Sequence, residues 1–194
     1  MEYTQPRSHR DDMVEIRKAL EMELNFVEES KNALRAKENF KNQSWIYIPD
    51  VYKNLTSRRI LTMEYVHGIK GNDPERMKKE GFSLKEVATK LFGAIAEQTF
   101  THGFLHADMH GGNFFVRKNP FNLNETQIVL LDHGLYNNMS DDFRIHYCKF
   151  WKALILRDND YIKEYCDKYQ IQDPDFYSGM ILMQGFDKIG PGKT

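Results

Sequence analysis

Residues 102–136 read HGFLHADMHGGNFFVRKNPFNLNETQIVLLDHGLY, and this stretch decides the fold. Within it, Asp108 and Asn113 stand five positions apart and directly precede a short apolar run. A second apolar run, residues 128–131, ends at Asp132. Phosphoryl transfer needs positioned metal ions and one carboxylate that orients the attacking hydroxyl. Two acids and an amide at the ends of short strands therefore predict a kinase-type catalytic loop at residues 106–113. A metal-binding loop, called the metal loop below, is predicted at residues 132–134.

The same residue types permit simpler interpretations. An Asp and an Asn five apart occur by chance in many loops, and it is Asp132 after an apolar strand that favours a catalytic pair. His102, His106 and His110 lie four apart, as in a helical zinc site. However, glycines interrupt any helix across them, and no Cys or Glu partner completes such a site. We interpret His106 as a structural residue whose ring braces the loop backbone.

Composition limits the classes of partner. The chain has 194 residues, of which 41% are hydrophobic and 28% charged, enough for a well-buried core and unlike a disordered protein. Its formal net charge of -1 gives no support for nucleic-acid binding. The two cysteines, Cys148 and Cys166, are too few and too far apart for a disulfide framework or a metal motif. No apolar run is long enough to span a bilayer, and residues 1–10 do not resemble a signal peptide.

Periodicity predicts the elements of the first part of the chain. Apolar residues at spacings of three or four predict a helix that begins at about Asp11. Residues 45–48 and 59–66 are rich in β-branched and aromatic side chains, which predicts two strands joined by a turn. Residues 67–74 contain two glycines and a proline and predict a loop, with a short polar helix at about 73–80.

The later part of the chain is predicted to be mostly helical. Ser83 and Glu86 have the spacing of a capping box, and the helix behind them should end near His102 and Gly103. A hairpin is expected from strands at 114–117 and 127–131. Three further helices are then expected, at about 140–155, 158–169 and 174–185.

Four segments, ELNFVEES, LTMEYVHGI, HGFLHADMHGGNFFV and LLDHGLY, together resemble the AarF/UbiB (ABC1-type) family of atypical protein-kinase-like enzymes, and most of all the animal mitochondrial aarF-domain-containing kinases. The resemblance implies an α+β, protein-kinase-like fold with a mostly helical C-terminal lobe and an incomplete N-terminal lobe. Residues 11–66 would be the remnant of the N-terminal lobe, with its hinge, and residues 67–185 the C-terminal lobe. Residues 1–10 and 186–194 are expected to be tails.

The resemblance also implies roles for individual residues. Asp108 falls at the catalytic aspartate, and Asn113 and Asp132 fall at the metal-binding residues. His133 stands in the place of the phenylalanine of the usual Asp-Phe-Gly motif. Glu29 falls where a helix glutamate pairs with the lysine that contacts ATP. In this reading, ATP and Mg²⁺ are the cofactors.

The hinge of the resembled family falls on LTMEYV. Met63 takes the gatekeeper position, and Glu64 and Val66 would present backbone groups to adenine. Glu23 and Asn25 fall on the family's E-x-D motif, where Asn25 is a departure because it cannot carry the charge of the aspartate.

Two further departures concern the catalytic loop and the nucleotide grip. Met109 and Gly111 replace prolines that are usual in the family, which removes no ligand but makes the loop less stiff. The family's K-x-G-Q helical extension, Ala-rich nucleotide loop and strand lysine have no counterpart in residues 1–10. We therefore expect weak or absent activity from this polypeptide alone.

The function that follows from the resemblance is ATP- and Mg²⁺-dependent phosphoryl transfer or ATP hydrolysis. The family implies a mitochondrial setting linked to lipid or ubiquinone metabolism, with a lipid or a protein as possible substrate. One alternative is a small-molecule phosphotransferase of the aminoglycoside or choline kinase type, which shares the H-x-D-x-x-x-x-N loop. The other is a non-catalytic pseudokinase or truncated scaffold module, which Mg²⁺-dependent nucleotide binding would distinguish from an enzyme.

Overall fold

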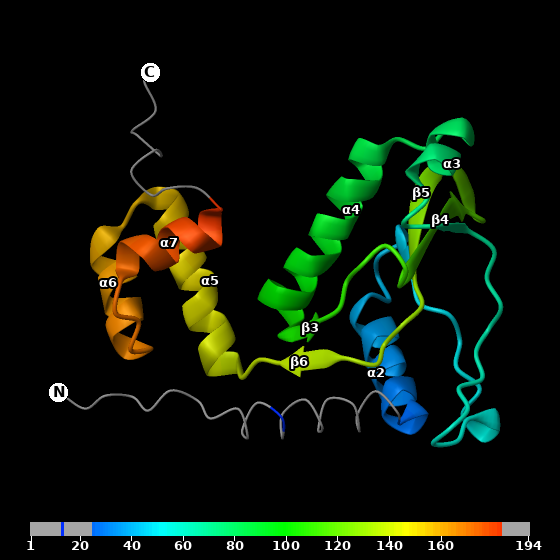
Figure 1. The fold of residues 1–194 in the computed structure, drawn as a ribbon, viewed down its shortest axis with the longest axis horizontal. Helices are drawn as coiled ribbons and strands as arrows, with labels where there is room; N and C mark the ends of the chain where they lie inside the picture. Colours follow the sequence, from blue (N-terminus) through cyan, green and yellow to red (C-terminus); the bar gives the residue numbers. More distant parts are fainter. Residues whose placement is uncertain (1–12, 14–24, 184–194) are drawn as a thin grey trace. The chain divides into compact units, whose positions relative to one another are not determined.

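A computed structural model describes Met13 and residues 25–183 (Figure 1). The chain divides into two compact units between Asn138 and Met139. The fold is a mixed α/β fold, as expected, with a small sheet in the first unit and, up to residue 183, only helices in the second. The lobe boundary expected after Val66 stays a prediction. Most of the helix expected from Asp11, together with Glu23, lies outside the described residues.

The first unit is built around a four-stranded sheet with the strand order β1-β5-β4-β2. The strands are β1 (Ile46–Tyr47), β2 (Ile69–Lys70), β4 (Phe114–Asn119) and β5 (Asn122–Leu130). β1 runs parallel to β5, whereas β4 is antiparallel to both β5 and β2. The sheet therefore unites segments from three distant parts of the chain, and β4 begins directly after Asn113.

The predicted hairpin is confirmed, but its strands are longer than expected. β4 continues to Asn119 and β5 begins at Asn122, so most of the expected connection is strand. Asn119 explains the tight turn, because its side-chain oxygen accepts the backbone N–H of Phe121 and its amide donates to Glu125. The hairpin holds the catalytic-loop end of β4 and the start of the metal loop at the same end of the sheet.

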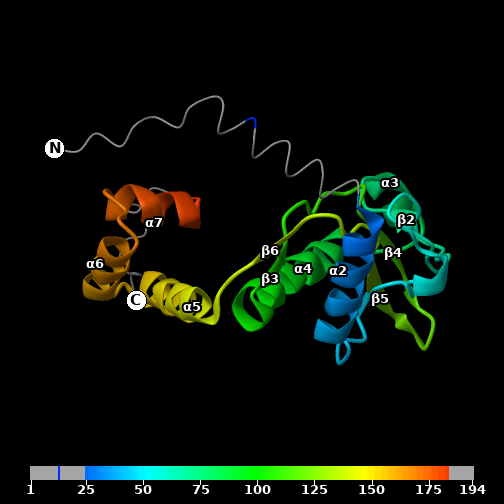
Figure 2. The same ribbon diagram turned by 90° about the horizontal axis from the view of Figure 1, so that it is seen from below.

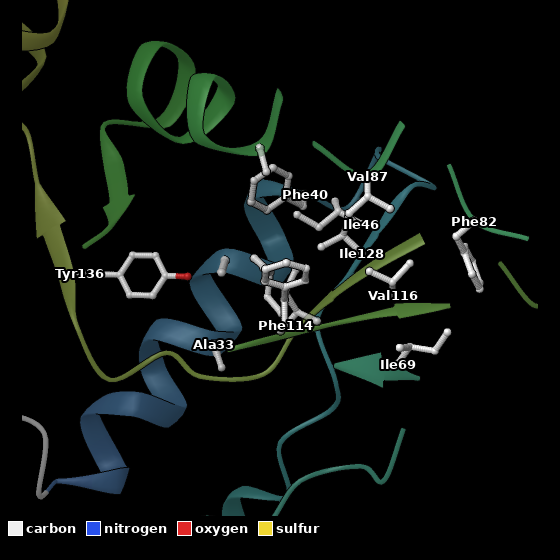
Figure 3. Packing of buried hydrophobic residues seen from close by; sticks show 14 of the residues in the cluster. Ala33, Phe40, Ile46, Ile69, Phe82, Val87, Phe114, Val116, Ile128 and Tyr136 are labelled. Atoms are coloured by element: carbon white, nitrogen blue, oxygen red, sulfur yellow. The ribbon is translucent and has the colours of Figure 1, made fainter. Parts of the chain in front are cut away.

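Helices α2 (Phe26–Asn39) and α4 (Leu84–Ala96) lie beside this sheet (Figures 1 and 2). Ala33 of α2 and Phe40, the residue that follows α2, pack in one core with Ile128 of β5 (Figure 3). Val87 of α4 joins the same cluster. Two minor elements complete this unit, the 3₁₀ turn η1 (Lys53–Leu55) and the helix α3 (Pro74–Lys79), which confirms the short helix expected here. Because α2 packs on the core that supports the hairpin, its position beside the sheet is fixed.

The predicted helix after Ser83 is confirmed in type and in its end. The Ser83 hydroxyl accepts the backbone N–H of Glu86, but the Glu86 carboxylate accepts from Thr126 instead of closing the capping box. α4 continues into a π-helical segment, η2 (Glu97–His102). The segment ends at Gly103, which has φ of 57° in the left-handed region where glycine is favoured.

The prediction of a strand over 59–66 is wrong. That segment forms only isolated bridges, of which one joins Val51 to Met63, while β1 pairs with β5 instead. Thr62 explains part of the difference, since its hydroxyl donates to the carbonyl of Leu55 and its backbone N–H donates to the Thr56 hydroxyl. Such local side-chain bonds compete with the hydrogen-bond ladder of a sheet.

A two-stranded ribbon was not predicted. β3 (Phe104–His106) pairs antiparallel with β6 (Tyr136–Asn138), and each strand is only three residues long. The ribbon matters for the site because β3 leads into the catalytic loop and β6 follows the metal loop.

The second unit consists of α5 (Asp141–Leu156), α6 (Asn159–Lys168) and α7 (Pro174–Leu182), which confirms the three predicted helices. Each begins at a side chain that caps its first turn. Phe150, Leu154, Ile162 and Tyr165 are buried together in its core. Among the residues that the structure describes, none of the helices is both long and apolar enough to cross a membrane.

Candidate active site

His106 joins the catalytic loop to the metal loop. Its Nδ1 accepts the backbone N–H of Asp108 at 3.1 Å, so Nε2 carries the proton and donates to the carbonyl of Asp132 at 2.9 Å. Burial lowers the pKa of His106 and keeps the ring neutral, as this pattern requires. The interpretation of His106 as a brace is therefore confirmed.

The side chain of Gln98 binds the backbone of His106, and sequence reasoning missed this residue. Its side-chain oxygen accepts the backbone N–H of His106 at 2.8 Å, and its side chain is 1% exposed. The signal in the sequence is a polar residue on an apolar stripe, since Leu91, Ala94 and Gln98 recur at helical spacing. A buried polar side chain at such a position needs a partner, and here the partner is the loop backbone.

Asn113 is tied to Asp108 and to Leu131, the residue that precedes Asp132. Its amide nitrogen donates to the carbonyl of Asp108 at 3.0 Å and approaches the Asp108 carboxylate at 3.4 Å. The backbone carbonyl of Asn113 accepts the N–H of Leu131. Because the amide nitrogen is engaged in this way, the amide oxygen is the atom of Asn113 that can serve a cation. Asn113 is 8% exposed.

Three of the sequence-predicted residues line a single pocket of about 320 Å³. These are Glu29, Asp108 and Asp132, and the lining is completed by Phe26, Gly134 and Leu135. Asp108 is the more exposed of the two aspartates, with a side chain that is 57% exposed. Phosphoryl transfer requires one carboxylate that can orient a hydroxyl and one that can hold a metal ion at the phosphate. The exposed Asp108 matches the first requirement, and Asp132, held in the metal loop, matches the second.

Asp132 and Glu29 face the same small space beside Gly134. The Asp132 Oδ1 accepts the N–H of Gly134 at 2.9 Å. A Cβ placed on Gly134 would lie 3.3 Å from that oxygen and 4.0 Å from the Oε2 of Glu29. Both carboxylates therefore approach the same point beside Gly134. Burial and the charge of Asp132 raise the pKa of Glu29.

The donors present fit a magnesium ion. Carboxylate and amide oxygens are the hard ligands that Mg²⁺ prefers, and the ion usually takes only one or two carboxylates from a protein and completes its shell with phosphates and water. Asp132 offers its second oxygen, and Asn113 its amide oxygen. Within residues 25–183 and Met13, no three His, Cys, Asp or Glu side chains converge to form a complete metal cage. This sparse donor set resembles a magnesium–phosphate site more closely than a structural metal site.

Glu29 supplies a prediction about stability in metal-free buffer. Its pKa is raised in the folded state, so the charged carboxylate opposes folding above the ordinary pKa and this penalty disappears as the pH falls. Glu29→Gln removes the charge and keeps an oxygen for the backbone N–H of His133. We expect a higher Tm for Glu29→Gln at pH 7.5 with EDTA present, and a smaller difference from the unaltered protein at pH 4.

The measurement is a pair of thermal melts at the two pH values. Glu28→Gln is the matched control, because Glu28 precedes Glu29 on the same helix but is exposed and paired with Lys31. An equal gain in the two variants, or a gain of Glu29→Gln that does not depend on pH, would contradict the assignment.

The hinge residues lie apart from this pocket. Val66 lines a second pocket of about 410 Å³, together with Gly68 and Phe115. Met63 and Glu64 line neither pocket. Phe115 is two residues beyond Asn113 on the chain, a separation of roughly 7 Å along a strand. The second pocket therefore begins close to the catalytic loop.

Glu64 has a structural partner for its side chain. Its carboxylate accepts the hydroxyl of Tyr47 at 2.6 Å and the backbone N–H of Asp50 at 3.1 Å. Burial, followed by the Glu64 carboxylate, raises the pKa of Tyr47 to about 12. The backbone N–H of Glu64 donates to the carbonyl of Asp50 at 2.7 Å. The side chain of Glu64 thus ties the predicted hinge to Tyr47 of β1 and to Asp50.

His133, in the place of the phenylalanine, is fixed within the core. Its side chain is 1% exposed, its Nδ1 accepts from the Tyr136 hydroxyl at 2.9 Å, and its Nε2 lies 3.4 Å from the carbonyl of Leu130. Burial lowers its pKa to about 3, so the ring is neutral. Tyr136 in turn stacks on Phe104 of β3. The ring therefore anchors the metal loop to the ribbon, a role that the sequence did not indicate.

A loop that is braced by a buried histidine and ends at Asn113, and an Asp-His-Gly loop that shares a pocket with Asp108, form the arrangement expected of a protein-kinase-like domain. Residues 4–166 match the model of the ABC1 atypical kinase-like domain. Since this match covers most of the chain, the protein belongs to the ABC1 (AarF) family of atypical kinase-like proteins.

Similar proteins agree with this assignment. A probable serine/threonine-protein kinase of Dictyostelium discoideum, abkD, is 39% identical over 92% of this chain and 26% of its own length. AarF domain-containing protein kinase 1 of Mus musculus is 34% identical over 92% of this chain and 34% of its own length. The chain thus spans about a quarter to a third of these curated relatives.

A solved structure supports the fold alone. The Rv3197–erythromycin complex from Mycobacterium tuberculosis superposes with a TM-score of 0.61 and 19% identity, over 85% of this chain and 40% of the other. The expected kinase-like fold is thereby confirmed.

Proposed function

We propose that this chain carries the catalytic and metal-binding part of an ATP- and Mg²⁺-dependent phosphotransferase or ATPase. The observation that supports this most directly is the pocket shared by Asp108, Asp132 and Glu29, together with the His106 bridge between the two loops. The fold alone would not imply chemistry, because one fold hosts many functions. Here the family's acidic residues meet at one place.

In this proposal Asp108 orients the attacking hydroxyl or water. It lies on the pocket wall, its backbone N–H is held by His106, and its carboxylate is approached by the Asn113 amide. The carboxylate is exposed enough to meet an incoming acceptor. A single positioned carboxylate is sufficient as a protein group here, because phosphoryl transfer depends mostly on orientation and charge stabilisation.

Asp132 and Asn113 would hold the metal. When bound, Mg²⁺ would offset the negative charge of the nucleotide phosphates and of the two facing carboxylates. Asp132 keeps one oxygen on the N–H of Gly134 and has the other for the cation. Asn113 contributes the oxygen of an amide whose nitrogen is fixed on the catalytic loop. Both donors thus enter the site already oriented.

The pocket at Val66 would receive the base of the nucleotide. Phe115 provides an aromatic side chain at this pocket, and Val66 and Gly68 come from the predicted hinge. We propose that the carbonyl of Glu64, whose N–H is bound to Asp50, and backbone groups of Val66 contact adenine beside Met63, as the family implies. The mitochondrial setting, the link to lipid or ubiquinone metabolism and a lipid or protein substrate are likewise proposals that rest on family membership.

A non-catalytic nucleotide-sensing or scaffold role is the second candidate. The observation that favours it is the partner of Glu29, which in the described residues is the backbone N–H of His133 and not a lysine. Without a lysine on the nucleotide phosphates, binding can persist while turnover is slow. The two candidates therefore share metal-dependent nucleotide binding and differ in turnover.

The test of the proposal is the thermal stability of the purified chain with ATP. A ligand that binds only the folded state stabilises it by about 2.7 kcal/mol at a concentration 100 times its Kd, which for a chain of this size raises the Tm by roughly 5 °C or more. We expect this rise with ATP and Mg²⁺ together. We expect a much smaller rise with ATP and EDTA, or with Mg²⁺ alone. Equal Tm values in all three conditions would reject the proposal for this chain.

A further inference from the structure

One face of α2 holds the metal loop by its backbone. Glu29 and Asn32 stand three residues apart, so they lie on the same side of the helix. The Glu29 carboxylate accepts the N–H of His133 at 3.2 Å, and the Asn32 amide donates to the carbonyl of the same residue at 3.0 Å. The helix therefore binds both polar backbone groups of the residue that follows Asp132.

These contacts fix two consecutive peptide units. In the unit between Asp132 and His133, the carbonyl accepts from His106 and the N–H donates to Glu29. In the unit between His133 and Gly134, the carbonyl accepts from Asn32 and the N–H donates to the Asp132 carboxylate. Both the carbonyl and the N–H of each of these two peptide planes are therefore hydrogen-bonded to a side chain.

The second plane sets the orientation of the metal ligand. The N–H of Gly134 holds one oxygen of Asp132, and the direction of that N–H depends on the rotation of the peptide unit that Asn32 grips. Because Gly134 has no Cβ to restrict the rotation, the amide of Asn32 is the group that resists it. Loss of the Asn32 bond would free the plane and, with it, the Asp132 carboxylate.

The same helix face continues to the ribbon. Arg35, three residues beyond Asn32, donates to the Asn138 side chain at 2.6 Å and lies 4.0 Å above the ring of Phe104. The metal loop, β3 and β6 are therefore all in contact with successive turns of α2.

We propose that Asn32 is a positioning residue for the metal site, and that Glu29 and Asn32 together form a backbone clamp that couples helix α2 to the Asp132 carboxylate. The proposal deepens the proposed function and rests on it, since it gives the clamp a role in Mg²⁺-dependent nucleotide binding. It also assigns Glu29 to the metal loop in this chain.

Asn32→Leu is the variant that tests it. Leucine has nearly the shape of asparagine and a better helix propensity, so α2 is preserved while the donor is lost and no charge is added. Asn39→Leu is the matched control, because Asn39 ends the same helix, is also half-buried, and makes no side-chain hydrogen bond within the described residues. Asn32→Gln restores an amide donor and should recover part of the effect.

The first readout needs no nucleotide. Hydrogen exchange of the backbone amides of His133 and Gly134 should accelerate about three- to tenfold in Asn32→Leu, the factor expected for one lost hydrogen bond. It should stay unchanged in Asn39→Leu. Unchanged exchange in Asn32→Leu would overturn the clamp, whatever the protein binds.

The second readout is the Mg²⁺ concentration that half-saturates ATP binding. It should rise about three- to tenfold in Asn32→Leu, while binding of ATP in EDTA is unchanged, and Asn32→Gln should lower it again. Faster exchange with an unaltered Mg²⁺ requirement would overturn the positioning role and leave the proposed function intact. An unaltered protein that binds no ATP with Mg²⁺ would overturn the proposed function, and with it the role of Asn32 in metal binding.

Discussion

His106→Leu is expected to lower the free energy of unfolding by about 2–4 kcal/mol, because it leaves two buried or half-buried loop groups without partners. These are the N–H of Asp108 and the carbonyl of Asp132, both of which bond to the imidazole. Leucine fills much of the ring's space but offers neither an acceptor nor a donor. Urea denaturation at pH 7.5 measures the loss.

His110→Leu is the matched control for that experiment. His110 lies in the same loop, but its side chain is 58% exposed, and its ring contacts two exposed groups, the N–H of Gly112 and, at 3.5 Å, the Asp108 carboxylate. Water replaces that bond, so the change should stay within about 0.5 kcal/mol. Equal losses in the two variants would show that His106 does not brace the two loops.

Asp132→Asn is expected to abolish the Mg²⁺-dependent part of the thermal stabilisation by ATP. Asparagine can still accept the N–H of Gly134, so the fold of the loop is kept, whereas the charge that attracts the cation is lost. The stabilisation by ATP and Mg²⁺ should fall to the level that ATP reaches in EDTA. Thermal melts with both ligands measure the change.

Asp108→Asn is the comparison that makes the result specific. It makes the same chemical change in the same pocket, but Asp108 is proposed to orient the acceptor and not to hold the metal. We therefore expect Asp108→Asn to keep the Mg²⁺-dependent stabilisation. Loss of that stabilisation in Asp108→Asn, or its persistence in Asp132→Asn, would contradict the division of roles.

The sequence was most informative where the pattern is local. The apolar runs beside Asn113 and Asp132 predict the hairpin, because a short continuous apolar run is a signal carried by neighbouring residues. The helix after Ser83 and the three helices of the second unit follow from their caps and apolar stripes. The kinase-like class came from four motifs in the right order, and family membership confirms it.

Sequence reasoning failed where a partner is distant along the chain. Residues 59–66 have the composition of a strand, but β1 takes β5 as its neighbour, about 80 residues away. Gln98 and Asn32 read as ordinary helix residues until their backbone partners, at His106 and His133, are known. Long-range hydrogen bonds of this kind leave only weak local signals, such as a polar residue on an apolar stripe.

The central claim is that the Asp-His-Gly loop holds the metal of a bound nucleotide. Mn²⁺ in place of Mg²⁺ tests it most directly, since the paramagnetic ion broadens the NMR signals of nearby amides. With ATP present, we predict strong broadening at Asp132 and Gly134 and little at Phe121, which lies in the turn after β4, beyond the strand end that is about 20 Å along the strand from Asn113. Equal broadening at Phe121 and Gly134, or none at Asp132, would contradict the assignment of this loop as the metal site.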